Sequence, residues 1–211
     1  MDNSKLQFYG KITSVQPRIR MTRSFDERTH SYLGYALRVS GSIGGTEREF
    51  TIGIGKSAQE KFLFCAGDEI SGECLPVPDE MLEPVEFYKV SKLKKGINIQ
   101  NKIIKMTPPW ETQPPDLETY RERGHRRLSA QTYNTKCTTC IWGCRMPVEI
   151  IIDNWNPDRR DHRFETFCYG PLSCRFYKAG PTRKVEGRKG MVWEEADWVD
   201  EEITSHRDPD E

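Results

Sequence analysis

The sequence predicts a mainly β protein in which five strands and one short helix precede a small cysteine-rich α+β module and an acidic tail. Three observations lead to this prediction. Segments rich in β-branched and aromatic residues recur before residue 95, a proline cluster follows them, and five of the seven cysteines fall within 38 residues. A length of 211 residues allows two modest units, each with a core of its own.

Five segments in the first half have the composition of strands, and the alternation of apolar residues is clearest at Phe50, Ile52 and Ile54. The five segments are 6–15, 32–41, 47–55, 69–77 and 85–93. Residues 56–68, between the third and fourth segments, lack β-branched side chains. We therefore expect a short helix there that ends at Gly67.

This order of strands and helix resembles the OB-fold, a small five-stranded barrel that often holds single-stranded nucleic acid. The resemblance covers residues 5–95, and GDEISGEC at 67–74 resembles that fold's entry into its fourth strand. It implies an OB-like barrel over residues 1–106 whose ligand face includes the connection between the first two strands. The candidate nucleic-acid contacts in that connection are Arg18, Arg20, Arg23 and Phe25.

The second half divides into three parts. Residues 107–117 contain four prolines, which prevent a helix and interrupt a sheet, so we expect a linker. Residues 118–192 form the predicted basic, cysteine-rich metal-binding module, with a short helix that ends near Gly124 and a strand from Val148. The stretch from 118 to the end of the chain resembles an uncharacterised prokaryotic family, and that resemblance implies no activity.

The acidic tail is predicted at residues 193–211. It contains little to bury besides Trp193, Trp198 and Val199, so the sequence leaves open whether it docks or stays disordered. Its acidic residues are expected to solubilise the chain, to fold back on the basic module or to recruit a basic protein partner.

The formal net charge is zero, but the charges are unevenly distributed. Residues 121–191 contain 15 basic and 7 acidic residues, whereas residues 192–211 contain one arginine and nine acidic residues. A surface rich in arginine suits phosphate backbones, because the guanidinium group makes bidentate contacts. The candidate nucleic-acid contacts in the basic module are Arg121, Arg126, Arg127, Arg159 and Arg160.

The clustered cysteines are the candidate metal ligands: Cys137, Cys140, Cys144, Cys168 and Cys174. In a chain without an export signal, such clustering indicates metal binding rather than disulfides. The two-residue gap between the first two lets both thiolates face one ion, and Gly170 and Pro171 provide a turn between the last two. A mononuclear zinc site needs four thiolates, so the sequence leaves open which four of the five ligate.

Structural zinc is the expected metal, because a small module with few large aliphatic residues would gain folding free energy from the ion. An iron–sulfur cluster of the 4Fe–4S type stays open as the alternative, since it also takes four thiolates. His125 and His162 each lie inside an arginine cluster that would repel a cation, so we expect neither to ligate.

The leading functional hypothesis is a protein that binds single-stranded DNA or RNA and contains a structural zinc site. The alternatives are an iron–sulfur protein in electron transfer or redox sensing, and a protein-interaction adaptor that uses its acidic tail. The sequence contains no phosphate-binding loop, serine elbow or HExxH motif, which favours a binding protein over an enzyme.

No apolar run approaches the roughly 18 residues that a membrane span needs. The N-terminus also lacks the basic start and apolar stretch of a secretory signal. We therefore expect a cytoplasmic protein with no membrane partner, and the sequence leaves its oligomeric state open.

Overall fold

A computed structural model describes residues 4–96, 105–156 and 158–208, and it is mainly β, as predicted. The strands are β1 (Leu6–Arg23), β2 (Arg28–Ile43), β3 (Thr46–Ile54), β4 (Glu69–Pro76), β5 (Phe87–Lys95), β6 (Arg126–Arg127), β7 (Gly143–Ile151), β8 (Arg160–Cys168), β9 (Arg183–Glu186) and β10 (Val192–Glu195). The helices and helical turns are α1 (Lys56–Phe62), α2 (Leu117–Arg123), α3 (Ala130–Thr132), η1 (Tyr133–Cys137), η2 (Arg188–Gly190) and α4 (Asp197–Thr204). Residues 97–104, at the end of the predicted first unit, lie outside the described residues.

The first five strands pair in a ring. β1 pairs antiparallel with both β2 and β4, β2 pairs with β3, and β4 pairs with β5. A parallel contact between Ile52 of β3 and Phe87 of β5 joins the last pair. Phe8, Leu37 and Phe50 are almost completely buried in the core that these strands share. The strand positions therefore agree with the alternation in the sequence.

β1 and β2 are longer than the sequence predicts. We expected β1 to end near Val15, but it continues to Arg23, and the connection to β2 spans only residues 24–27. The reason is that Ile19 and Met21 continue the buried face of the strand beyond its predicted end. The three candidate arginines of the expected loop therefore lie within β1, which corrects that prediction.

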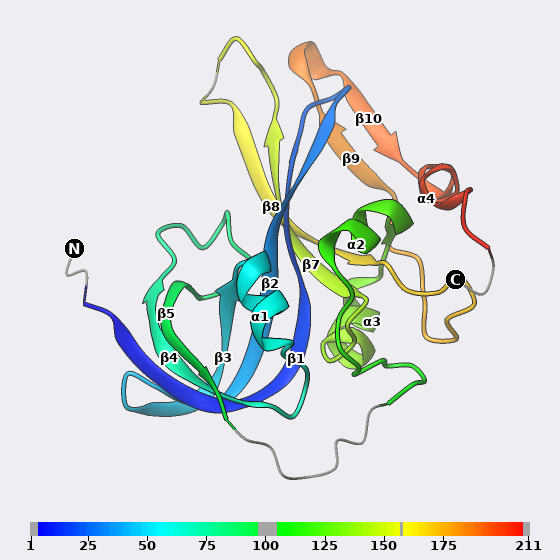
Figure 1. The fold of residues 1–211 in the computed structure, drawn as a ribbon. Helices are drawn as coiled ribbons and strands as arrows, with labels where there is room; N and C mark the ends of the chain where they lie inside the picture. Colours follow the sequence, from blue (N-terminus) through cyan, green and yellow to red (C-terminus); the bar gives the residue numbers. More distant parts are fainter. Residues whose placement is uncertain (1–3, 97–104, 157, 209–211) are drawn as a thin grey trace.

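The long hairpin of β1 and β2 joins the two halves of the protein. Residues 21–23 of β1 pair in parallel with residues 148–150 of β7, so one eight-stranded sheet has the order β2-β3-β5-β4-β1-β7-β8-β6. Figure 1 shows this hairpin extending out of the ring, with its upper part between the β7–β8 and β9–β10 strands. The two predicted units thus share a sheet.

The predicted linker is packed against both halves. The hydroxyl of Tyr35 donates to the carbonyl of Pro115 at 2.8 Å, and the amide of Ile141 donates to the carbonyl of Trp110 at 2.9 Å. Because one contact is to β2 and the other is to the turn before β7, this segment helps to hold the halves together.

Two helix ends test the predicted boundaries. α1 ends at Phe62 rather than at Gly67, because Leu63 adopts a left-handed conformation (φ 49°) and its amide donates to the carbonyl of Gln59. α2 ends at Arg123, followed by the capping residue Gly124 with φ 65°, so it ends near Gly124 as predicted. None of the helices in the described residues is long and apolar enough to cross a membrane.

The acidic tail is folded over the residues that the structure describes. β10 pairs with β9, and α4 then lies beside α2 and the cysteine-rich half (Figure 1). Of the alternatives that the sequence left open for residues 193–208, the structure shows docking.

Candidate functional site

Four of the five clustered cysteines converge because of how β7 pairs with β8. Cys137 and Cys140 precede β7, whereas Cys168 ends β8 and Cys174 follows it. The strands are antiparallel, and Gly143 is the register partner of Cys168. The beginning of β7 therefore lies beside the end of β8, and all four cysteines line one small cavity.

Tight turns present these cysteines. The amide of Cys140 donates to the carbonyl of Cys137 at 3.1 Å, and the amide of Cys174 donates to the carbonyl of Pro171 at 3.2 Å. A Cβ at Gly143 would lie 2.6 Å from the carbonyl oxygen of Cys137, so only glycine fits where the first turn enters β7.

Gln16 of β1 holds the first turn from the side of the strand ring. Its Nε2 donates to the carbonyls of Cys137 and Cys140, both at 2.8 Å, and its Oε1 accepts a hydrogen bond from the Tyr133 hydroxyl at 2.7 Å. All three contacts are buried or half-buried. The position of the Cys137–Cys140 turn is thus set by a side chain more than 100 residues away in the sequence.

Backbone amides face two of the sulfurs. The amide of Gly170 donates to Cys168 Sγ at 3.4 Å, and the backbone amides of Trp142 and Trp110 hydrogen-bond to Cys140. Gly170 and Trp142 each follow their cysteine by two residues, whereas Trp110 comes from the proline-rich segment before α2. Such hydrogen bonds favour the thiolate form, which is the form that binds metal ions.

Burial of the thiols and repulsion between neighbouring thiolates disfavour the thiolate form. Burial, followed by the neighbouring thiols, raises the pKa of Cys137 and of Cys140 to about 12, and burial raises the pKa of Cys168. The thiols therefore need a cation among them to ionise together, as Zn²⁺ provides.

The cavity that the four cysteines line has a volume of about 10 Å³, and Trp110, Trp142 and Tyr177 are among the other residues that line it. Within the ranges that the structure describes, no three or more Cys, His, Asp or Glu side chains are already grouped as a metal site. Coordination would therefore require the four side chains to turn toward a common centre. The donor set of four cysteines from two turns nevertheless fits tetrahedral zinc.

Cys144 lies apart from the other four. It is fully buried in the main core, and its thiol donates to the carbonyl of Pro17 at 3.5 Å. It faces the same way as Met146, Val148 and Ile150, which are also buried in β7. This alternation could have identified Cys144 as a core residue if the predicted strand had begun at Gly143 rather than at Val148.

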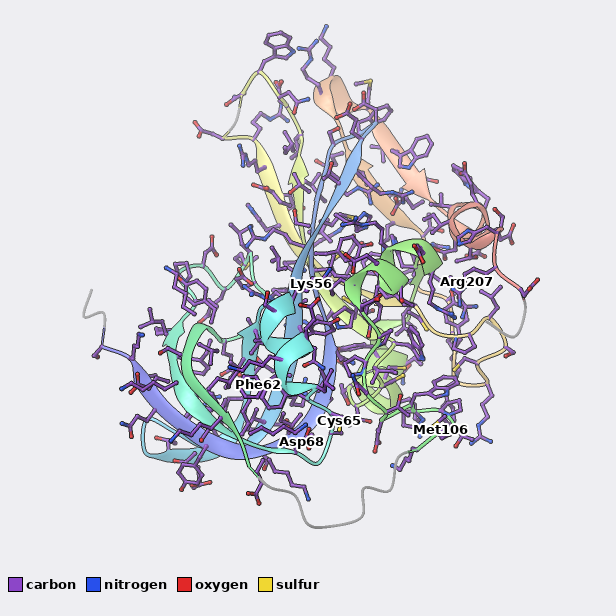
Figure 2. All side chains as sticks on the ribbon, in the orientation of Figure 1. Lys56, Phe62, Cys65, Asp68, Met106 and Arg207 are labelled. Atoms are coloured by element: carbon purple, nitrogen blue, oxygen red, sulfur yellow. The ribbon has the colours of Figure 1, made fainter. Side chains whose placement is uncertain are left out.

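The two remaining cysteines are also distant from this cavity. Cys65 lies beyond the end of α1 beside Asp68, and its amide donates to Asp68 Oδ2 at 2.9 Å (Figure 2). Cys74 is buried in β4, and burial raises the pKa of its thiol to about 11.

The two histidines considered as ligands lie elsewhere as well. His125 packs against Phe167 and His30, with ring centroids 4.6 and 5.0 Å away, and burial lowers its pKa well below the ordinary value. Nε2 of His162, on β8, lies 3.8 Å from Oε1 of Glu149, on β7. Neither lines the cysteine cavity.

The arginines predicted between the first two strands form ion pairs. Arg18 and Arg20 both bind Glu83, at 2.7 and 2.9 Å, and Arg23 binds Glu195 at 2.8 Å. Phe25 lies in the β1–β2 connection and packs against a tail tryptophan. These charges are largely compensated within the protein.

The basic-module arginines divide into buried and exposed groups. Arg127 is 2% exposed and binds Asp200 of the tail, and Arg126 donates to a carbonyl of the Pro171 turn. Arg121, on the surface of α2, lies over the ring of Tyr32 in β2. Arg160 pairs with Glu149, and Arg159 is exposed. The candidate nucleic-acid contacts therefore do not form one free basic surface.

A second feature is a groove of about 530 Å³ where the strand ring meets the cysteine-rich half. Arg38 of β2, Arg145 of β7 and Phe164 of β8 line it, together with the β4–β5 connection. The guanidinium of Arg145 lies 3.7 Å from the centroid of the Phe164 ring. Sequence analysis missed these residues because they come from different strands and form no local cluster.

No protein-family model, no curated protein and no solved structure matches this chain.

Proposed function

We propose that this protein binds single-stranded nucleic acid in the groove between an OB-like barrel and the cysteine-rich half, and that a structural zinc ion stabilises that half. The observation that carries the proposal is the groove itself, which combines an exposed arginine with an aromatic ring. Single-stranded nucleic acid is commonly held by positive charge along its backbone and by stacking of its bases on aromatic side chains.

The strand pairing supports the barrel. The ring runs β1-β2-β3-β5-β4 and returns to β1, with α1 between the third and fourth strands of the chain. A five-stranded barrel with this helix position is the arrangement that the OB-fold resemblance implies. In that fold the connections β1–β2 and β4–β5 flank the ligand face, and the β4–β5 connection lines this groove.

The charges in the groove favour an anionic ligand. Arg145 has no ion pair within the described part of the chain, and its position over Phe164 leaves the ring edge and the guanidinium together at the surface. Three carboxylates line the groove: Glu83 is compensated by two arginines and Glu86 by Arg48, whereas Glu80 is exposed and has no ion pair in the described residues. A phosphate contacting Arg145 would therefore meet little repulsion from Glu83 and Glu86.

The size of the cysteine cavity favours zinc over an iron–sulfur cluster. A cavity of about 10 Å³ is just large enough for one water molecule, so its size is nearer to one ion than to a cluster. A 4Fe–4S cube would require the two turns to move apart. Because the turns are held by Gln16 and by Arg207, which donates to the carbonyl of Gly170 at 2.6 Å, they are not free to separate.

The experiment measures fluorescence anisotropy of labelled DNA and RNA strands of about 20 nucleotides, since one OB domain covers up to about 16. We expect affinity to fall steeply between about 50 and 200 mM salt. Arg145→Ala is expected to reduce the salt slope by about one, and Phe164→Ala to weaken binding by about fivefold to 150-fold through lost stacking.

The matched control is Arg188→Ala, which removes an exposed arginine that does not line the groove. Binding that weakens equally in Arg188→Ala and Arg145→Ala would contradict the groove. Absence of binding to both DNA and RNA at low salt would contradict the function, and a preference between them would identify the substrate.

A further inference from the structure

A second cavity lies at the tip of the long hairpin and shares no lining residue with the groove or the cysteine cavity. Its volume is about 280 Å³, and its walls come from the β1–β2 connection, β10 and α4. Three aromatic side chains line it: Phe25, Trp193 and Trp198. Arg23 at the end of β1 and Arg28 at the start of β2 also line it, and none of the clustered cysteines does.

The Trp193 ring stands nearly at right angles to the rings of both Phe25 and Trp198. The Phe25 and Trp193 centroids are 6.4 Å apart at 77°, and those of Trp193 and Trp198 are 5.7 Å apart at 78°. Trp193 is 38% exposed and Trp198 is 48% exposed. Neighbouring perpendicular rings with open faces form adjacent walls, and an aromatic face attracts a cation through its quadrupole.

The charged residues make the cavity negative. Arg23 and Arg28 line it, but both bind Glu195. Asp26, Glu27 and Glu202 also line it, and none of these three has an ion pair in the described part of the chain. Four carboxylates therefore face two guanidinium groups, and the negative charge in excess lies beside exposed tryptophans.

We propose that this cavity binds a cationic side chain, arginine or lysine, from a basic segment of a partner protein. The aromatic walls accommodate the flat guanidinium or the alkyl stem of lysine, and the unpaired carboxylates neutralise its charge. A nucleic acid is disfavoured here, because its phosphates would face uncompensated carboxylates. Charge complementarity with the acidic surface of α4 extends the contact beyond the cavity.

The test uses the full-length protein and a labelled nine-residue peptide of alternating arginine and glycine. A second peptide with citrulline in place of arginine keeps the shape and removes the charge. We expect the arginine peptide to bind at least tenfold more tightly than the citrulline peptide, and binding to weaken as salt increases. Indole N–H signals of Trp193 and Trp198 should shift in NMR spectra when it binds.

Two variants with matched controls locate the site. Trp198→Ala is expected to weaken binding by about threefold to thirtyfold, which is the range of a cation–π contact, and Glu202→Gln is expected to weaken it as well. Trp155→Ala removes a tryptophan that is 84% exposed on the β7–β8 connection, and Glu201→Gln removes a neighbouring carboxylate that does not line the cavity. Both controls should leave the affinity unchanged.

Several results would overturn the proposal. One is equal binding of the two peptides, and another is an equal loss of affinity in the variants and their controls. A third is displacement of the peptide by an oligonucleotide, if that displacement is the same in Arg145→Ala. Self-association abolished by Trp198→Ala would instead make a second copy of the chain the occupant. Because Glu202→Gln changes an exposed side chain, it remains informative if Trp198→Ala misfolds.

Discussion

Arg23 and Glu195 form a buried, bidentate ion pair that joins β1 to the acidic tail. Both hydrogen bonds are 2.8 Å long, and the side chains are 3% and 5% exposed. Burial alone would raise the pKa of Glu195, but the hydrogen bonds and charge of Arg23, with the charge of Arg28, hold it below its usual value. Glu195 therefore stays ionised and fixes β10 against the long hairpin.

Glu195→Gln is expected to lower the free energy of unfolding by about 3–5 kcal/mol, because it leaves the buried charge of Arg23 without a partner. Urea denaturation followed by circular dichroism measures this change. Glu49→Gln is the control, since Glu49 pairs with Arg38 at the surface and should contribute less than about 1 kcal/mol. Similar losses in both variants would contradict a special role for the buried pair.

The neutral histidine pair makes stability depend on pH. Burial, together with Arg28 and Arg23, lowers the pKa of His30 to about 4, and burial, followed by the charges of His30 and Arg28, lowers the pKa of His125 well below its ordinary value. Between about pH 4 and 6.5 the unfolded chain binds more protons than the folded one, so stability falls as pH falls. The slope is expected to reach about 1.4 kcal/mol per pH unit for each histidine.

Unfolding free energies at pH 7 and pH 5 test this dependence, and His30→Gln should reduce the difference between them. His162→Gln changes a histidine on β8 and is the control. Glu195 affects stability in a separate pH range. Because its pKa is lowered in the folded protein, its contribution to stability is complete above about pH 4.5 and is lost only below that pH. A wild-type difference that persists unchanged in His30→Gln would show that other groups cause it.

Gly143→Ala is expected to disturb the first cysteine turn. The new Cβ would lie 2.6 Å from the carbonyl oxygen of Cys137 and 2.9 Å from Gln16 Nε2, so stability should fall by about 1–3 kcal/mol. Thermal unfolding measures the loss. Gly55→Ala is the control, because a Cβ there meets nothing within 4 Å and should change stability by less than about 1 kcal/mol. An unaffected Gly143→Ala protein would mean that the turn can shift.

Much of the fold follows from local patterns. Alternation of apolar residues predicts the strands, and Gly124 predicts the end of α2, because both depend on residues close together in the chain. The length of β1 was missed, since Pro17 and three arginines obscure the continuing buried face at Ile19 and Met21.

The roles of the arginines could not be predicted from charge counts. An arginine in a basic cluster is expected at the surface. Arg127 is instead buried against Asp200, which lies 73 residues further along the chain. Such pairs depend on how the tail folds back, and no local pattern encodes that. For the same reason the groove at Arg145 and the aromatic cavity at Trp198 became visible only in the structure.

The central claim is that Cys137, Cys140, Cys168 and Cys174 bind one zinc ion and that Cys144 does not take part. The most direct measurement is metal analysis with absorption spectroscopy of wild type, Cys168→Ala and Cys144→Ala, purified with and without air. We predict about one zinc per chain in wild type and in Cys144→Ala, and loss of zinc in Cys168→Ala. Iron with absorption near about 400 nm, or loss of zinc from a folded Cys144→Ala protein, would contradict the account.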